Sequence, residues 1–62
     1  MGDYAKDVKR ELINNGFSLK RSGKGSHQIW SDGITTVPVP KKVQRLLANA
    51  IMAQAGLNKR FK

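Results

Sequence analysis

The spacing of apolar positions predicts a helix near the start of the chain. Ala5, Val8 and Leu12 recur at helical intervals, and charged residues occupy most of the positions between them. Asp3 is expected to cap the first turn, because a carboxylate can accept hydrogen bonds from the free N–H groups there. Gly16 follows two asparagines and suits the left-handed conformation that often ends a helix. A helix is therefore predicted from about residue 4 to residue 15.

The pattern then changes to one that is typical of strands. Residues 17–21 alternate apolar and polar positions, with Phe17 and Leu19 expected to face inward. Residues 26–30 form a second candidate strand, and residues 34–39, which are rich in β-branched side chains, form a third. Three strands in two hairpins predict a small antiparallel sheet.

Two turns separate these strands. Residues 22–25 form a cationic, glycine-rich turn, and residues 31–33 (Ser-Asp-Gly) form a hairpin turn, since Asp-Gly tolerates positive φ angles. Pro38 has no N–H to donate, so it is expected at an edge of the sheet or near the end of its strand.

The last third of the chain predicts a second amphipathic helix. Its expected inward face follows the spacing i, i+3, i+4, i+7, i+8 and i+11 and consists of Val43, Leu46, Leu47, Ala50, Ile51 and Gln54. Pro40 precedes it, and Gly56 is suited to end it. The predicted order is helix-strand-strand-strand-helix, a two-layer α+β domain in which both helices cover one face of the sheet. One domain is expected over residues 1–62, with residues 58–62 as a partly loose basic tail.

Composition narrows the partners of this domain. The chain has 62 residues, a net charge of +8 and no cysteine. So short a domain has marginal stability, and disulfides are excluded, so support from a protein partner or an oligomer is expected. One histidine and four scattered acids leave no set of ligands for a metal, and no cofactor is expected. The excess of cations indicates a polyanion such as nucleic acid, or an acidic protein, as the partner.

Membrane association is not expected. The chain has no apolar run of transmembrane length, and its N-terminus lacks the basic-then-apolar pattern of a signal peptide. Because the absence of cysteine also fits a reducing compartment, a cytoplasmic location is expected.

The lone histidine, His27, is the strongest candidate for chemistry. Histidine can both accept and donate a proton near neutral pH, and RNA carries its own nucleophile, the 2′-hydroxyl. One base and nearby cations can therefore cleave RNA without a metal. A structural role fits as well, because alternation places His27 on the same face as Ile29. We expect His27 at the rim of the sheet, where its strand begins.

Basic residues close to His27 in the sequence, or at the predicted start of the last helix, are candidates for contacts to phosphate. They are Lys20, Arg21 and Lys24 around the first turn, and Lys41, Lys42 and Arg45 at the helix start. Lys59, Arg60 and Lys62 form a third patch in the tail, and a solvated surface is the alternative for each patch. Trp30 could stack on a base, but packing at a sheet edge or an interface is the favoured interpretation.

In their order and spacing, four fragments of the chain resemble the HicA toxins of bacterial and phage toxin–antitoxin systems. They are Asn15-Gly16-Phe17, Gly25-Ser26-His27-Gln28-Ile29-Trp30, Thr36-Val37-Pro38-Val39 and Ile51-Met52-Ala53-Gln54-Ala55-Gly56-Leu57. The resemblance implies a fold like that of double-stranded RNA-binding domains. It also implies a ribosome-independent mRNA interferase that arrests growth and that a HicB antitoxin blocks. His27 would be the catalytic residue, with Gly25 and Ser26 as the flanks of its motif.

The chain departs from the family pattern in one segment. Many relatives have further polar residues, often histidine or threonine, between the Val-Pro-Val strand and the body of the last helix. Here this segment, residues 40–47, is short, and Leu46-Leu47 makes the helix unusually apolar. Two other functions also fit the residues: a non-catalytic RNA-binding module, and an interaction protein whose basic face serves only an acidic partner.

Overall fold

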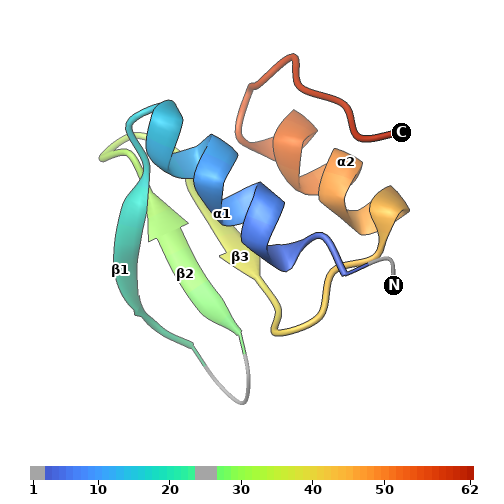
Figure 1. Cartoon of the computed structure of the whole chain (residues 1–62). Coiled ribbons are helices and arrows are strands. Elements are labelled where there is room, and N and C mark those ends of the chain that lie inside the picture. The colour runs from blue at the N-terminus through green and yellow to red at the C-terminus, as the bar shows by residue number, and fades with distance from the viewer. Residues whose placement is uncertain (1–2, 24–26) are drawn as a thin grey trace.

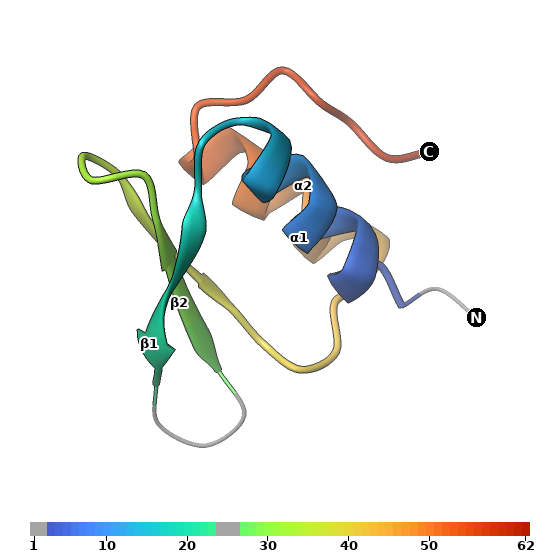
Figure 2. The ribbon, with the colours of Figure 1, turned by 60° about the vertical axis from the view of Figure 1, so that its left-hand side comes forward.

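The computed structural model describes residues 3–23 and 27–62. Along the chain lie helix α1 (Ala5–Asn14), strands β1 (Ser18–Ser22), β2 (Gln28–Ser31) and β3 (Thr36–Val39), and helix α2 (Arg45–Gln54). The strands form one antiparallel sheet in the order β1-β2-β3. The helices lie side by side on one face of this sheet (Figures 1 and 2). The α+β class and the helix-strand-strand-strand-helix order are therefore confirmed.

Asp3 at the start of α1 and Gly16 after its end define the two ends of the helix. Asp3 lies one residue before the N-cap position, which Tyr4 occupies, so the predicted cap is displaced by one residue. Its carboxylate still accepts hydrogen bonds, from the N–H of Ala5 at 3.1 Å and from that of Val43 at 3.3 Å. At the other end, Gly16 has a φ of +87°, as expected of a residue that ends a helix in the left-handed region.

Strands β2 and β3 are shorter than predicted, whereas β1 keeps its predicted length but begins one residue later. The alternation in β1 is interrupted. The register of β1 against β2 shifts between Leu19 and Arg21. Leu19 lies opposite the buried Trp30, yet 48% of it is exposed, because β1 is an edge strand. Leu19 therefore shares the face of Trp30, as predicted, but is not buried. β3 is the other edge strand and contains Pro38, which confirms the expectation that this proline lies at an edge.

The core lies between the sheet and the two helices. Its fully buried side chains come from both helices, from β3 and from the segment before α2: Leu12, Ile51, Met52, Val8, Val37, Val39 and Val43. Trp30 joins them on the central strand and is only 7% exposed, so it neither lies at a sheet edge nor offers a ring for base stacking. Its indole Nε1–H donates to Oε1 of Gln28 at 3.4 Å.

Helix α2 presents to the core a face that agrees only in part with the one predicted. Ile51 and the preceding Val43 are buried as expected, but Ala50 and Gln54 are exposed. The helix begins at Arg45 and buries Ala48, Ile51 and Met52, whereas Leu46 is 75% exposed and Leu47 41% exposed. The sequence of α2 carries apolar residues on both sides, so periodicity alone cannot choose between them. Within the described residues, no helix is long and apolar enough to cross a membrane.

The connection into α2 explains which side turns inward. The N–H of Tyr4 donates to the carbonyl of Val43 at 2.7 Å, and the N–H of Val43 donates to Asp3. These two bonds hold the start of α1 against the segment before α2. Val43, which is 1% exposed, is thereby fixed in the core and sets the rotation of the helix that follows.

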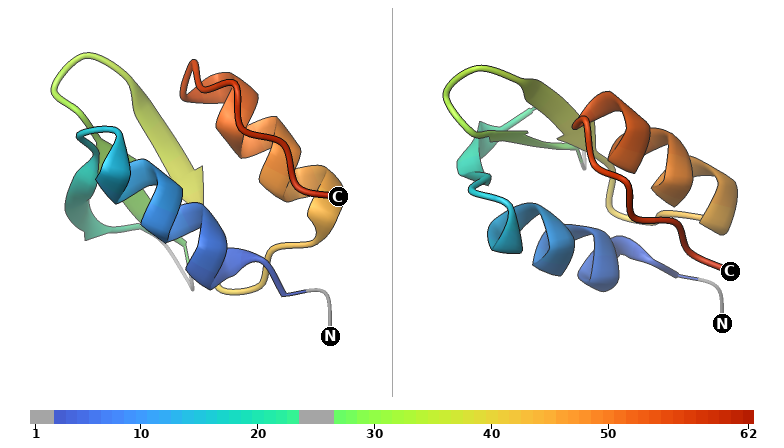
Figure 3. Two further views of the ribbon diagram at one scale, coloured as in Figure 1. Left: turned by 45° about the horizontal axis from the view of Figure 1, so that its top comes forward. Right: turned by 90° about the horizontal axis from the view of Figure 1, so that it is seen from above.

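The tail that was expected to be partly loose runs back along α2, toward the start of α1 (Figure 3). The side chain of Asn49 accepts a hydrogen bond from the N–H of Phe61 at 2.7 Å and donates one to its carbonyl at 3.2 Å. The Phe61 ring packs on that of Tyr4, with 5.4 Å between the ring centroids. The tail thus connects the two helices.

Candidate nucleic-acid interface

His27 lies directly before β2 and is exposed. Its carbonyl accepts a hydrogen bond from the N–H of Gly23 at 2.8 Å, which continues the pairing of the first hairpin. The position agrees with the prediction of a histidine at the rim of the sheet, where the strand begins. A base at this place can reach a substrate from solvent.

The neighbours of His27 in the sheet explain why it is not covered. Ile29 lies opposite Pro38, which is exposed, whereas the core pair on these two strands is Trp30 and Val37. Successive side chains of a strand point to opposite faces, so Ile29 belongs to the face without helices. Sharing the face of Ile29 therefore does not bury His27.

The register places three of the expected cations near the same end of the sheet. Arg21 lies opposite Ile29 near the end of β1 and is exposed. Gln28, the first residue of β2, lies opposite Val39, the last residue of β3. The exposed Lys41 and Lys42, which follow β3, are therefore at the same end of the sheet as His27, which precedes β2. The other predicted contacts, Lys24, Gly25 and Ser26, lie outside the described residues.

The prediction for Lys41 and Lys42 needs one correction. The two lysines were expected at the N-terminus of the last helix, whose free N–H groups would favour phosphate. The helix begins only at Arg45, so both lysines belong to the connection before it. Their contribution to binding is therefore that of side-chain charges.

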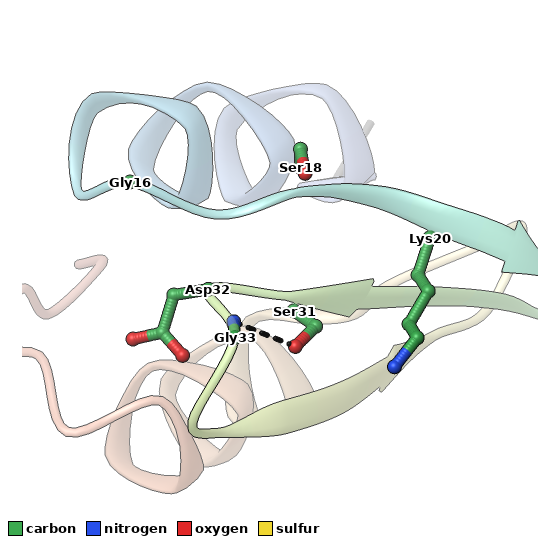
Figure 4. Close-up of a pocket in the computed structure, with 6 residues that line it drawn as sticks. All are labelled: Gly16, Ser18, Lys20, Ser31, Asp32 and Gly33. Atoms are coloured by element: carbon green, nitrogen blue, oxygen red, sulfur yellow. Dashed lines mark hydrogen bonds between the residues drawn. The ribbon is translucent and has the colours of Figure 1, made fainter.

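Lys20 lies elsewhere on the sheet than the other cations. It lines an open pocket of about 330 Å³ together with Ser18, Ser31 and the turns that contain Gly16 and Gly33 (Figure 4). These turns are at the end of the sheet opposite His27. The pocket was missed from the sequence, because it depends on the register that sets Ser18 opposite Ser31.

The β2–β3 turn gives this pocket a fixed wall. The carboxylate of Asp32 accepts hydrogen bonds from the N–H groups of Thr35 at 2.7 Å and Ile34 at 2.9 Å, and these bonds lower the pKa of Asp32. The N–H of Gly33 donates to Oγ of Ser31 at 3.0 Å. Asp32 is therefore engaged in holding the turn, and its carboxylate lies at the opposite end of the pocket from the Lys20 amine (Figure 4).

Few of the basic side chains are neutralised within the molecule. Among residues 3–23 and 27–62, the single ion pair joins Asp7 to Arg10 at 3.9 Å. Hydrogen bonds from Ala5 and Val43, and then the charges of Lys42 and Lys9, lower the pKa of Asp3. Over the same residues, no group of three or more His, Cys, Asp or Glu side chains gathers as a metal site would require.

Comparison with known families identifies the chain. The family described as the HicA toxin of bacterial toxin–antitoxin systems matches residues 5–57. This range includes both helices, all three strands and His27. No curated protein and no solved structure matches the chain. Because the match extends over nearly the whole domain, the chain belongs to the HicA toxin family.

Proposed function

We propose that this toxin is a metal-independent endoribonuclease, an mRNA interferase, in which His27 is the catalytic base. The observation that carries the proposal is the position of His27, which is exposed at the end of the sheet near Arg21, Lys41 and Lys42. Membership of a toxin family supports a damaging activity, and the net charge of +8 supports a polyanionic substrate. Since mRNA is the substrate, the toxin would act in the cytoplasm.

The proposed reaction uses the nucleophile that RNA provides. The imidazole of His27 removes the proton of a 2′-hydroxyl, the 2′-oxygen forms a bond to the adjacent phosphorus, and the bond from phosphorus to the 5′-oxygen breaks. The leaving 5′-oxygen takes a proton from water or from the protonated imidazole. The products are a 2′,3′-cyclic phosphate and a free 5′-hydroxyl, so the step consumes no other reactant.

Positive charge near His27 would serve both binding and catalysis. Lys41, Lys42 and Arg21 would contact the phosphates on either side of the scissile bond, and Lys24, with the flanking Gly25 and Ser26, belongs to the same proposed site. As negative charge builds up on the phosphorane, a fixed cation stabilises the transition state more than the ground state. Lys20, which lines the pocket at the other end of the sheet, would contact a more distant phosphate.

The partner of the toxin completes the proposal. Toxins of this family belong to toxin–antitoxin systems, and we propose that a HicB-type antitoxin binds this chain and covers His27. An acidic antitoxin surface would neutralise the same cations that bind RNA.

Replacing His27 by alanine tests the catalytic role. His27→Ala is expected to slow cleavage of a purified transcript in EDTA by about 100- to 10,000-fold, the usual contribution of general acid–base catalysis. Its circular dichroism and thermal unfolding should match those of the unmodified chain, because the side chain is exposed. Gln44→Ala, at another exposed position, is the matched control and should cleave normally.

Two results would contradict this mechanism. Products with 5′-phosphate ends, or an absolute need for magnesium, would exclude attack by the 2′-hydroxyl with His27 as the base. If His27→Ala still degrades transcripts, His27 is not catalytic. If neither protein cleaves but both bind RNA with a steep salt dependence, the chain is a non-catalytic RNA-binding module.

A further inference from the structure

Helix α2 has an outward face that the fold does not use. Arg45 is its single charged residue, and the run from Leu46 to Asn58 has none, in a chain with 12 basic and 4 acidic residues. A surface helix ordinarily turns charged or polar residues to solvent. α1 does so with Lys6 and Arg10, which are both exposed, so the uncharged exterior of α2 is particular to that helix.

The exposed residues of α2 form a second apolar stripe. Leu46, Ala50 and Ala53 follow the spacing i, i+4 and i+7, all three are exposed, and Leu47 lies beside them. The opposite side of the helix, with Ala48, Ile51 and Met52, already fills the core. We call the stripe of Leu46, Leu47, Ala50 and Ala53 the outer face of α2.

The tail leaves this face open. Asn49 lies beside the stripe, on one side of the helix, and holds Phe61 by two hydrogen bonds. Phe61 packs against Tyr4, which directly precedes α1. The tail therefore covers the side of α2 that faces α1. Leu46 keeps 75% of its surface exposed.

Charge at the two ends of the face identifies the kind of occupant. Lys41, Lys42 and Arg45 precede it, and Lys59 and Arg60 follow it. A second copy of the chain would place cations against cations, and each molecule carries a net charge of +8. Electrostatic repulsion therefore opposes self-association through this face. RNA would find no cation between Leu46 and Asn58. An apolar protein surface with an acidic rim matches both the face and its surroundings.

We propose that the outer face of α2 docks an apolar, acid-rimmed surface of the antitoxin, as a contact additional to the one that covers His27. The inference rests on the proposed function only in taking the antitoxin as the partner. It assigns to Leu46 and Leu47 a role in neutralisation and none in RNA cleavage. Leu46, as the most exposed large side chain of the face, is the anchor.

The experiment compares two apolar-to-acidic substitutions. Leu46→Glu changes the face, and Ile34→Glu makes the same chemical change on the β2–β3 turn, where Ile34 is 92% exposed. Binding is measured by calorimetry, with the purified antitoxin encoded beside the toxin as the probe. Loss of an anchor residue corresponds to at least about a 30-fold weaker affinity. Leu46→Glu should show this loss, Ile34→Glu should bind as the unmodified chain does, and both should cleave RNA at the unmodified rate.

A third variant tests the charge argument. Leu46→Lys loses the same apolar contact but adds a cation, so it should bind the acidic rim more tightly than Leu46→Glu does. Thermal unfolding of both Leu46 variants should remain close to that of the unmodified chain, since lysine and glutamate are good helix formers at exposed positions. Ile34→Glu should also unfold normally, because Ile34 is 92% exposed.

The outcomes separate this inference from the proposed function. Unchanged antitoxin affinity in Leu46→Glu overturns the docking face, whatever His27→Ala does to cleavage. Loss of antitoxin affinity in Leu46→Glu supports it even if the chain proves not to cleave RNA. If Leu46→Glu abolishes self-association but leaves antitoxin affinity unchanged, the occupant is a second copy of the chain. If Leu46→Glu abolishes binding to neutral lipid vesicles but leaves antitoxin affinity unchanged, the occupant is a membrane surface. Either result overturns the proposal.

Discussion

Replacement of Asn49 by alanine should release the C-terminal tail from the body of the toxin. The Asn49 side chain makes two hydrogen bonds to the backbone of Phe61, at 2.7 and 3.2 Å, and no other side chain of α2 makes a hydrogen bond to the tail within the described residues. Without them, the end of the tail keeps the packing of the Phe61 ring on that of Tyr4 and the exposed hydrogen bond that the Tyr4 hydroxyl donates to the Lys62 carbonyl at 3.3 Å. The expected result is a less stable domain with a more mobile tail.

The size of the effect follows from these contacts. A hydrogen bond contributes about 0.5–1.5 kcal/mol net, so the two bonds contribute about 1–3 kcal/mol. Alanine favours the helix over asparagine by about 0.6 kcal/mol, which offsets part of the loss. A net destabilisation of about 0.4–2.4 kcal/mol remains, and it should lower the melting temperature by roughly 2–19 °C in so small a domain. This is a substantial share of the roughly 3–9 kcal/mol expected for a chain of this length.

Urea denaturation of Asn49→Ala measures the free energy of unfolding, and trypsin digestion measures access to Lys59 and Arg60. Cleavage in the tail should become faster before the body of the domain unfolds. Gln54→Ala, at an exposed position of the same helix, is the control and should stay within about 0.5 kcal/mol of the unmodified chain. Asn49→Asp keeps the acceptor for the Phe61 N–H and should be intermediate. An Asn49→Ala variant as stable as Gln54→Ala, with an equally resistant tail, would refute a structural role for these bonds.

Two further predictions concern charge. The folded-state pKa of Asp3 lies below its ordinary value of 3.8, because the carboxylate accepts hydrogen bonds from Ala5 and Val43. Its contribution to stability is therefore present above pH 3.8 and is lost as the pH falls through the folded pKa, so urea titrations should show the advantage of the unmodified chain over Asp3→Ala shrinking at acid pH. A constant difference from pH 6 to pH 2 would contradict this linkage. Separately, Arg21→Gln should weaken RNA binding for all sequences alike and reduce the slope of log K against log salt by about 1, as measured by filter binding or fluorescence anisotropy. An unchanged slope would remove Arg21 from the RNA interface.

Local sequence signals were sufficient for the order of the elements but not for the rotation of α2. Ala5, Val8 and Leu12 lie on the only apolar side of α1, and all three are buried as predicted. In α2, both Leu46-Leu47 and Ile51-Met52 are apolar pairs, and the choice between their sides depends on bonds between Val43 and residues 3–4. These partners are about 40 residues apart in sequence, and hydrophobic periodicity carries no information about them.

The same limit applies to the strands and the tail. Strict alternation placed Leu19 inward, but the register shift between Leu19 and Arg21 and the edge position of β1 leave it half exposed. The tail looked loose because its residues are mostly basic. Its ordered position depends on the hydrogen bonds between Asn49 and Phe61, which no local sequence pattern predicts.

For the candidate site, chain order alone placed His27 at the start of a strand. Antiparallel pairing then determines which other residues lie at the same end of the sheet. Once β2 pairs with both neighbours, the end of β1 and the exit of β3 must lie at the end of the sheet where His27 is found. What alternation could not decide was which sheet face the helices cover. The partner of Ile29 answers this, because Pro38 is exposed while Val37, its neighbour in β3, is buried.

The marginal size of the domain and the open face of α2 can be understood together. A partner that binds only the folded chain stabilises it by RT ln(1 + [L]/Kd), which is about 4 kcal/mol at a thousandfold excess over Kd. This is comparable with the whole stability expected of a domain of 62 residues. An apolar helix face that contributes little to the isolated fold, such as Leu46 with 75% of its surface exposed, can therefore still strengthen the complex. The bound toxin should then unfold at a distinctly higher temperature than the free toxin. A roughly 30-fold weaker affinity removes about 2 of these roughly 4 kcal/mol, so Leu46→Glu should lose about half of that increase while leaving the free toxin unchanged.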